Sequence, residues 1–322
     1  MPKNSRKRTL IAGLLALISV QTASAQGQIG TRASGMAGAF VAVADDATAV
    51  YWNPAGVATG SIVSVVLDAG RFQSGPDPQG LETQKDTSAV VALSATAIGL
   101  AYYRLGTYGK GKPKPVVAGP ESREEVGRSV HAITTNTAGV SLVQSLNEHI
   151  VIGATPKIVV GAGRVVADVD AGVMAWANRF RFGLVARNLT TPSFRGGLSR
   201  PSEAEADDAG ATELGREVRI GGAWGSGWTG VSRVIVSADA DLISRAAPDG
   251  DRRDVAAGVE TWWMSQRLGL RGGVRSSTIG GARAAVAAGI SAGLQPGMLV
   301  EAHVVRGHGD ERSWSVGARM TF

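Results

Sequence analysis

The sequence predicts an all-β protein: a transmembrane antiparallel β-barrel of about 14 strands. Three observations predict this fold class. The chain begins with an export signal and has no cysteine, apolar residues stand at every second position through most of its length, and long and short connections alternate. Together they favour strands that separate two different solvents, lipid on one face and a polar interior on the other.

The first 25 residues have the pattern of a secretory signal peptide. Four basic residues precede a mainly apolar run over 9–20, and the small residues at 23–25 suit a signal peptidase. This run is too short for a membrane anchor, which needs about 18 apolar residues or more. Cleavage after Ala25 removes four basic and no acidic residues, so the formal charge falls from +6 to 6 − 4 = +2. The charge therefore gives no argument for a nucleic-acid partner.

Composition excludes several other classes of protein. The absence of cysteine excludes a disulfide scaffold and a cysteine-ligated zinc site, and a hydrophobic content of 44% excludes a disordered chain. The longest uncharged stretches, 47–67, 87–103 and 129–147, are interrupted by Asn53-Pro54 or diluted by polar residues and glycine, so none is expected to be a membrane helix. An exported chain without an anchor is then either a soluble periplasmic protein or an outer-membrane barrel.

Alternation with a period of two is clearest at the C-terminus. There the apolar residues are Trp314, Val316, Ala318, Met320 and Phe322. The expected strands are 60–71, 87–95, 98–107, 129–145, 149–165, 167–177, 180–191, 216–225, 231–243, 253–264, 268–277, 284–294, 298–307 and 312–322. Most have about 8–12 residues, the length with which a tilted strand crosses a bilayer. The terminal Phe322 resembles the signal that the barrel assembly machinery reads in outer-membrane proteins.

The connections between these strands differ in length in a regular way. The long ones, such as 72–86, 108–128 and 192–215, fall at odd positions in chain order, and short turns fall at even positions, with one exception near Val166. Membrane barrels have this order because short turns face the periplasm and long loops face outward. A soluble β-sandwich, the alternative fold, has no reason to produce it.

Charged residues also occur within the alternating strands. An arginine on the lipid face near the bilayer midplane costs about 2–4 kcal/mol, so we expect these side chains to face the lumen or the rims. Residues of both signs are present, which favours ion pairs across the lumen over a selectivity filter. The positions are Arg219, Arg233, Asp239, Asp241, Glu260, Arg271, Arg275 and Glu301.

Residues 26–59 lack the strand pattern. Asp45 or Asp46 is suited to cap a short helix over 47–52, and Asn53 should end it because a residue before proline avoids the helical region. Small residues over 35–39 allow close backbone packing. An apolar, partly helical stretch attached to a barrel can hide its surface in the lumen, so we expect a hatch or plug there.

Residues 33–56 resemble the N-terminal hatch of FadL-like outer-membrane barrels, including the PorV/PorQ branch. Asn53-Pro54-Ala55 matches the family's Asn-Pro-Ala sequence, and an acidic pair precedes it. The hatch signature comprises Asp45, Asp46, Trp52, Asn53 and Pro54. The resemblance implies a fourteen-stranded barrel with an N-terminal hatch in the bacterial outer membrane, in contact with lipid and lipopolysaccharide. Residues 185–189 and the final strand also resemble the family.

Sites for chemistry are weak, and we expect no cofactor and no bound metal. Residues 289–293 match the G-x-S-x-G nucleophile pattern, but Ser291 lies within an alternating strand instead of at a strand-turn-helix elbow. The pairs Asp168/Asp170 and Asp239/Asp241 place two carboxylates on one strand face, where salt bridges are favoured over a cation site. Lys110, Lys112 and Lys114 stand in an expected outer loop, with contact to lipopolysaccharide phosphate as a lesser alternative. The histidines at 131, 149, 303 and 308 show no ligand spacing.

Three functions remain open at this point. The first is passage of small hydrophobic or amphiphilic molecules across the outer membrane, with the hatch moving to open a path. The second is a PorV-like role, in which a non-conducting barrel is the partner of a secretion or surface-attachment machine. The third, an outer-membrane hydrolase using Ser291, lacks the expected local structure.

Overall fold

The computed structural model describes residues 28–73, 85–111, 130–194, 212–229, 232–246, 251–280, 283–308 and 311–322. The predicted signal peptide lies outside the described residues. Lys112, Lys114 and the side chain of Lys110 also lie outside them, so the outer-loop lysines are not placed.

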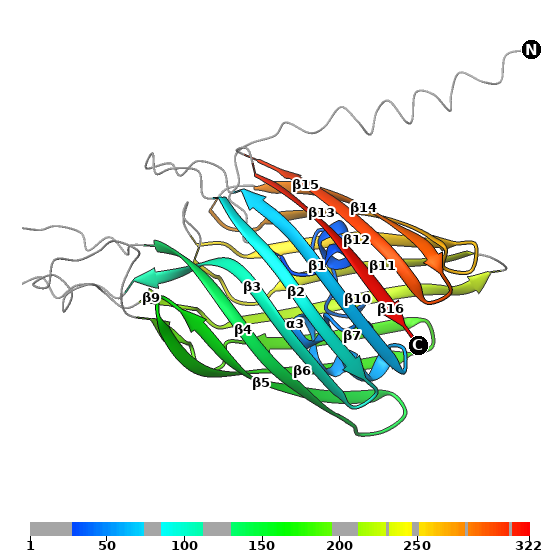
Figure 1. Ribbon diagram of the computed structural model, residues 1–322, viewed down its shortest axis with the longest axis horizontal. Coiled ribbons are helices and arrows are strands. Elements are labelled where there is room, and N and C mark those ends of the chain that lie inside the picture. Colours follow the sequence, from blue (N-terminus) through cyan, green and yellow to red (C-terminus); the bar gives the residue numbers. More distant parts are fainter. Residues whose placement is uncertain are drawn as a thin grey trace, which may run out of the picture.

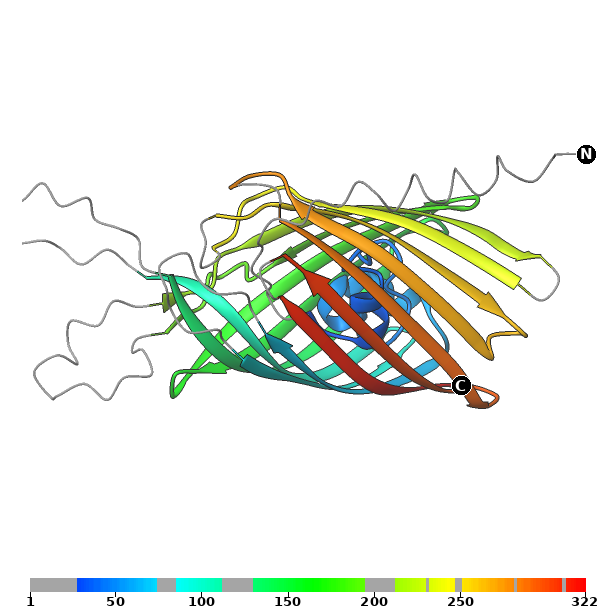
Figure 2. The same cartoon turned by 90° about the horizontal axis from the view of Figure 1, so that it is seen from above.

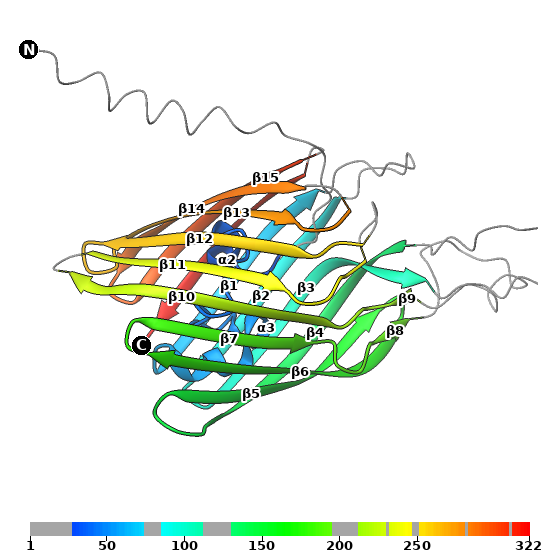
Figure 3. The same ribbon diagram turned by 180° about the vertical axis from the view of Figure 1, so that it is seen from behind.

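Fourteen long antiparallel strands form a closed barrel (Figures 1 and 3). They are β1 (Val63–Gln73), β2 (Lys85–Ala95), β3 (Ile98–Gly111), β4 (Val130–Ser145), β5 (Ile150–Gly161), β6 (Arg164–Ala177), β7 (Phe180–Arg187), β10 (Glu217–Thr229), β11 (Ser232–Asp241), β12 (Asp254–Trp263), β13 (Leu268–Ser277), β14 (Ala284–Gln295), β15 (Met298–Gly307) and β16 (Arg312–Thr321). Each pairs with its chain neighbour, and β1 pairs with β16 to close the cylinder. The short strands β8 (Ser193–Phe194) and β9 (Thr212–Glu213) form a hairpin on the end of β3. The predicted fold class is confirmed.

Several predicted boundaries differ from those in the structure, and three of the differences have a clear local reason. The first strand starts at Val63 instead of residue 60, because residues 54–59 form a 3-10 helix. The fifth ends at Gly161, because Ala162 and Gly163 turn the chain with φ of 47° and 73°. Val166 therefore belongs to β6. The last strand ends at Thr321, although the backbone of Phe322 still pairs with that of Val63, at 2.9 and 3.2 Å.

Successive residues of each strand face opposite sides of the wall. In β12, Ala256 and Glu260 are buried on the inner side, whereas Val255 and Val259 are exposed on the outer side. The outer face is apolar over neighbouring strands too, as Val236, Val274 and Val286 show. An exposed apolar surface of this extent suits hydrocarbon, not water.

Residues 28–59, called the luminal segment below, lie inside the barrel (Figure 2). The segment contains α2 (Thr31–Gly35), α3 (Ala49–Trp52) and the 3-10 helix η1 (Pro54–Thr59). Nearly all of its residues are buried, and they form the main apolar core together with inward residues of the wall. Within the described part of the chain, no helix has the length and apolar character needed to span a membrane.

The two ends of the barrel differ. At one end the strands are joined by tight turns such as 96–97 and 296–297, and the chain enters β1 and leaves β16 there, as the C label marks in Figure 1. We call this the short-turn end. The opposite, long-loop end carries the connection that includes β8 and β9.

The outward position of Val259 near the middle of β12 gives a direct test of the lipid-facing surface. We expect Val259→Arg to lower the free energy of unfolding in lipid vesicles by about 2–4 kcal/mol, because it places a charge in hydrocarbon. Gln295→Arg, at the exposed end of β14, should cost about 1 kcal/mol or less. Equal losses in urea unfolding of the two variants would contradict a membrane-spanning outer face.

Candidate functional site

The local structure of the luminal segment follows from two polar side chains. Asp46 accepts hydrogen bonds from the backbone N and the Oγ1 of Thr48, at 2.9 and 2.5 Å, so residues 46–48 form a turn and α3 begins at Ala49 instead of 47 as predicted. Asn53 has an extended backbone, and its Oδ1 accepts from the backbone N of Ala55 at 3.2 Å. It therefore ends α3 and caps η1. Its Nδ2 donates to the carbonyls of Val41 and Val173, both at 3.1 Å.

Arg32 of α2 is the centre of a buried ion-pair network. Its Nε and Nη2 donate to the two carboxylate oxygens of Glu260 on β12, at 2.8 and 2.7 Å. Its Nη1 reaches Asp45 at 2.5 Å and Asp46 at 3.2 Å. Arg181 of β7 is a second partner of Asp45, at 3.3 Å. Burial opposes ionisation of Asp45, but the charges of Arg32 and Arg181 more than offset it, so the pKa of Asp45 lies below its ordinary value.

The network continues along the wall to Glu301 of β15. Its Oε1 accepts from Arg271 at 3.2 Å and from Arg319 at 3.1 Å, and Arg271 also lies 3.3 Å from Glu260. The Oγ of Ser291 donates to the same Glu301 oxygen at 2.7 Å. Ser291 is buried in the middle of β14, with a carboxylate and Arg271 as its partners, so its surroundings are those of a structural hydroxyl.

A second group of contacts holds residues 38–41. Asp239 of β11 accepts hydrogen bonds from the backbone N atoms of Phe40 and Val41, at 2.7 and 2.9 Å. The wall donates in return to two carbonyls: Ser237 to that of Ala39, at 2.7 Å, and Arg219 to that of Gly38, at 3.3 Å. Arg219 also donates to Asp241 at 2.6 Å. Wall side chains thus satisfy backbone groups that a buried loop would otherwise leave unpaired.

A third contact joins α2 to the place where the barrel closes. The backbone N of Thr31 donates to Asp68 of β1 at 2.7 Å, and the Thr31 hydroxyl also contacts this carboxylate. The hydroxyls of Thr31 and Ser315 on β16 lie 2.6 Å apart. The first and last strands therefore share a partner in the luminal segment.

Three pairs of glycines on neighbouring strands bring the wall against the backbone of the luminal segment. The directly paired residues are Gly153/Gly172, Gly183/Gly221 and Gly258/Gly273. A Cβ at Gly153 would lie 2.6 Å from the backbone N of Ala55, and one at Gly183 would lie 2.6 Å from the Val41 carbonyl oxygen. A Cβ at Gly273 would meet the main chain of Met36. Only glycine lets the two backbones approach this closely.

The remaining residues singled out in the sequence lie outside these three groups of contacts. Arg275 pairs with Glu311, while Arg233 has no salt-bridge partner among the described residues. Asp168 and Asp170 lie 3.2 and 2.7 Å from Nζ of Lys157. Trp52 donates from Nε1 to the carbonyl of Ile29 at 2.8 Å, Pro54 is the first residue of η1, and Phe322 is exposed. In the described ranges, no group of three or more acidic, histidine or cysteine side chains could hold a metal ion.

Sequence reasoning missed Arg32, Asp68 and the glycine pairs. Arg32 lies outside any strand, so the alternation that pointed to Glu260 gave no sign of its partner. The glycines did leave a signal, because Gly258 stands at the same inward parity as Ala256 and Glu260.

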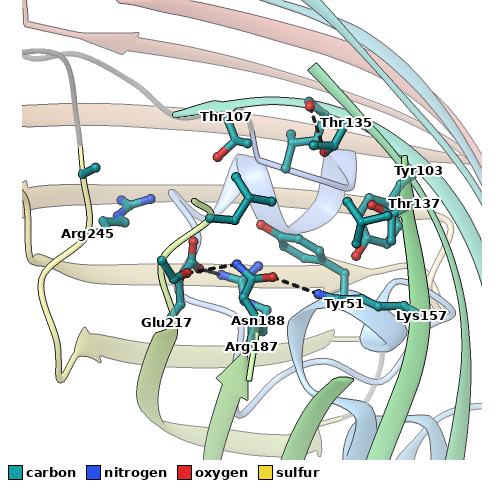
Figure 4. A pocket seen from close by; sticks show the side chains of 15 residues that line it. Tyr51, Tyr103, Thr107, Thr135, Thr137, Lys157, Arg187, Asn188, Glu217 and Arg245 are labelled. Carbon is teal, nitrogen blue, oxygen red and sulfur yellow. Dashed lines mark hydrogen bonds and ion pairs between the residues drawn. The ribbon is translucent and has the colours of Figure 1, made fainter. Parts of the chain in front are cut away.

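Residues 47–59 of the luminal segment separate two cavities. The cavity toward the long-loop end is lined by Tyr51, Tyr103, Lys157 and Arg187, among others (Figure 4). Arg187 pairs with Glu217, and its guanidinium lies 4.1 Å from the centre of the Tyr51 ring. This cavity has only about 50 Å³, room for a few water molecules.

The second cavity, called the basin below, has about 470 Å³ and lies toward the short-turn end. Val43, Ala58 and Thr59 of the luminal segment line it, together with residues of β6, β7, β10 and β11. The chain is therefore a closed barrel with a water-sized cavity on one side of its luminal segment and a ligand-sized one on the other.

Comparison with solved structures shows similarity to transport barrels. The monoaromatic hydrocarbon channel CymD matches with a TM-score of 0.61 and 11% identity, over 91% of this chain and 97% of that one. The Pseudomonas putida toluene transporter TodX gives 0.57 and 11%, over 91% and 98%. A FadL homologue from Pseudomonas aeruginosa gives 0.57 and 13%, over 93% and 100%. At these identities the likeness shows a shared fold. Neither a family model nor a curated protein matches the sequence.

The glycine contacts predict that one methyl group displaces the luminal segment. Gly273→Ala should lower the free energy of unfolding by about 1–3 kcal/mol and make residues 28–59 more accessible to protease, because the added Cβ meets the Met36 main chain. The matched control is Gly272→Ala, where the nearest atom to a Cβ, the Ala287 carbonyl oxygen, is 3.6 Å away. If the two variants have the same unfolding free energy and the same protease sensitivity, the close packing at Gly273 does not hold the luminal segment in place.

The ion-pair network predicts a larger loss of unfolding free energy when one of its members is removed. Arg32→Leu should cost about 3–5 kcal/mol, because it leaves Glu260 and Asp45 buried with fewer partners. Arg306→Leu, at an exposed position, should cost about 1 kcal/mol or less. Adding Glu260→Gln to Arg32→Leu should recover part of the stability by removing an unmatched charge. Urea unfolding in detergent tests this, and a double variant no more stable than Arg32→Leu would argue against charge matching.

Proposed function

We propose that this protein is a FadL-like barrel of the bacterial outer membrane that passes small hydrophobic or amphiphilic molecules across it. The observation that carries the proposal is the luminal segment: a folded plug inside a closed barrel, with a cavity on each side of residues 47–59. The fold shared with CymD, TodX and the FadL homologue supports the choice of hydrophobic solutes.

The outer-membrane location is supported by the apolar outer face and by the predicted signal peptide. With this location, lipid covers the outer face, lipopolysaccharide surrounds the long-loop end, and the short-turn end faces the periplasm. Insertion then depends on the barrel assembly machinery, which would read the C-terminal strand ending in Phe322.

Passage requires the luminal segment to move, and its two halves are held differently. Residues 31–46 make all of its ion pairs with the wall, through Arg32 and Asp45, and breaking a buried pair costs about 3–5 kcal/mol. Residues 47–59 form no ion pair with the described wall: they are held by hydrogen bonds such as those of Asn53 with Val173 and of the backbone N of Ala47 with Ser64 at 3.2 Å, and by the cation–π contact of Tyr51 with Arg187. We therefore assign the movement to residues 47–59, which lie between the two cavities.

A reversible cross-link tests this movement, and the cysteine-free chain makes it specific. A Cβ at Gly99 would lie 3.1 Å from Cγ2 of Val57 and 2.6 Å from Cγ2 of Val50, so Val57→Cys with Gly99→Cys brings two thiols close together once the Val50 side chain shifts. Oxidation should abolish uptake of labelled toluene by cells carrying this variant, and reduction should restore it. Uptake before oxidation shows whether the substitutions themselves are tolerated.

Two further cysteine pairs are controls. Ser141 and Thr155 bridge two wall strands, with side-chain oxygens 2.7 Å apart, and Thr31 with Ser315 ties the ion-paired half. Oxidation of either pair should leave uptake unchanged. Unchanged uptake with 57–99 locked would overturn the proposed movement. If cells with and without the unmodified protein took up toluene equally, a non-conducting, PorV-like role would be favoured instead, which the close packing of the luminal segment also suits.

A further inference from the structure

The basin at the short-turn end combines an apolar surface with an excess of positive charge. Val43, Trp176 and Ile235 provide apolar surface on its floor and walls. Arg179 in the β6–β7 turn, Arg181 on β7 and Arg233 on β11 also line it, and no acidic residue of the described ranges does.

These arginines have fewer carboxylate partners than the arginines deeper in the barrel. Arg32, Arg219, Arg271 and Arg319 each lie within 3.3 Å of a carboxylate. In the basin only Arg181 has such a partner, Asp45 at 3.3 Å, whereas Arg179 and Arg233 have none among the described residues. Positive charge therefore exceeds negative charge at this place in the lumen.

The geometry points to a binding site in the basin for an organic anion, namely a carboxylate joined to a small flat apolar body. Guanidinium groups bind carboxylates through paired, charge-assisted hydrogen bonds, and the Trp176 ring offers an aromatic surface beside them. The volume of about 470 Å³ lies within the usual range for small-molecule sites. This inference rests on the proposed transport function only in that transport would bring the ligand to the basin. It adds organic anions to the neutral hydrocarbons as a substrate class.

The position of the arginines excludes head groups of the surrounding lipid as the ligand. Ile235 is buried on the inner side of β11 and Val236 is exposed on the outer side, so Arg233 shares the inward parity of Ile235. Arg181 likewise alternates with the exposed Phe180 and Phe182. An anion must therefore enter the lumen to reach both.

Asp45 connects this site to the luminal segment. A bound carboxylate competes with Asp45 for Arg181, while Asp45 keeps its contact with Arg32 at 2.5 Å. Ala58 and Thr59, in the half of the segment assigned to movement, line the same basin. A ligand in the basin would therefore contact residues 58–59 of one half and weaken the Asp45–Arg181 ion pair of the other half.

Equilibrium dialysis of the purified full-length protein in detergent, with labelled benzoate as the probe, tests the inference. Arg233→Gln and Arg181→Gln should each weaken benzoate binding about tenfold or more, because each removes a charged partner. Arg306→Gln, at an exposed position away from the basin, is the control and should leave the affinity unchanged. Asp45→Asn should strengthen binding severalfold, since it removes the internal competitor. Benzoate should also bind more tightly than acetate, which lacks the flat apolar body, and than toluene, which lacks the charge.

Several results would overturn the inference. These are affinity for toluene equal to that for benzoate, benzoate binding unaffected in both arginine variants, or inorganic phosphate binding as tightly as benzoate. Circular dichroism of each variant separates loss of the site from loss of the fold. Because dialysis measures binding without transport, benzoate binding in a protein that passes no solute would refute the transport proposal and leave the site intact. Toluene uptake without benzoate binding would refute the anion site and leave the transport proposal intact.

Discussion

A charge buried inside a closed barrel is costly unless an opposite charge matches it, and most of the interior outside the basin follows from this constraint. An unmatched buried ion costs several kcal/mol. The bidentate pairing of Arg32 with Glu260 is the centre of the solution, because it fixes α2 to β12 and, through Arg271, connects the luminal segment to Glu301. The segment is therefore as much a part of the charge balance as of the apolar core.

The fold could be predicted from the sequence, whereas the contacts inside the barrel could not. Period-two alternation located all fourteen long strands, because one face of each strand meets lipid and the pattern is local. The cost of a charge in hydrocarbon predicts that Glu260 and Arg271 face inward, and both side chains are buried in the structure. It could not indicate that Arg32 would pair with Glu260, which is 228 residues away, because a long-range partner depends on how the segment lies in the barrel. The missing partner of Arg233 was likewise invisible, since strand parity says nothing of neighbours across the lumen.

The two halves of the luminal segment differ in the contacts that hold them to the wall. Ion pairs and carboxylate acceptors hold residues 31–46, whereas residues 47–59 are held by hydrogen bonds and by one cation–π contact, that of Tyr51 with Arg187; glycine contacts occur in both halves. A structure of this kind can change shape in one half while the other keeps its position, because the cost of separating neutral groups is smaller than that of separating charges. The cavities lie on either side of the weakly held half, where a change of shape would join them.

The contact of Thr31 with Asp68 and Ser315 has a consequence for how the molecule is assembled. β1 and β16 are the first and last strands of the barrel, and they pair along ten residues of each. Because Thr31 touches both strands from inside, the cylinder closes around a segment that is already in place, or the segment must thread into a finished barrel whose glycine-lined wall lacks the backbone it fits. The stability of the closing strand pair and that of the docked segment are therefore coupled, because Thr31, Asp68 and Ser315 share their hydrogen bonds. The two strands of the closing pair come from parts of the chain about 250 residues apart, and the luminal segment contacts both of them.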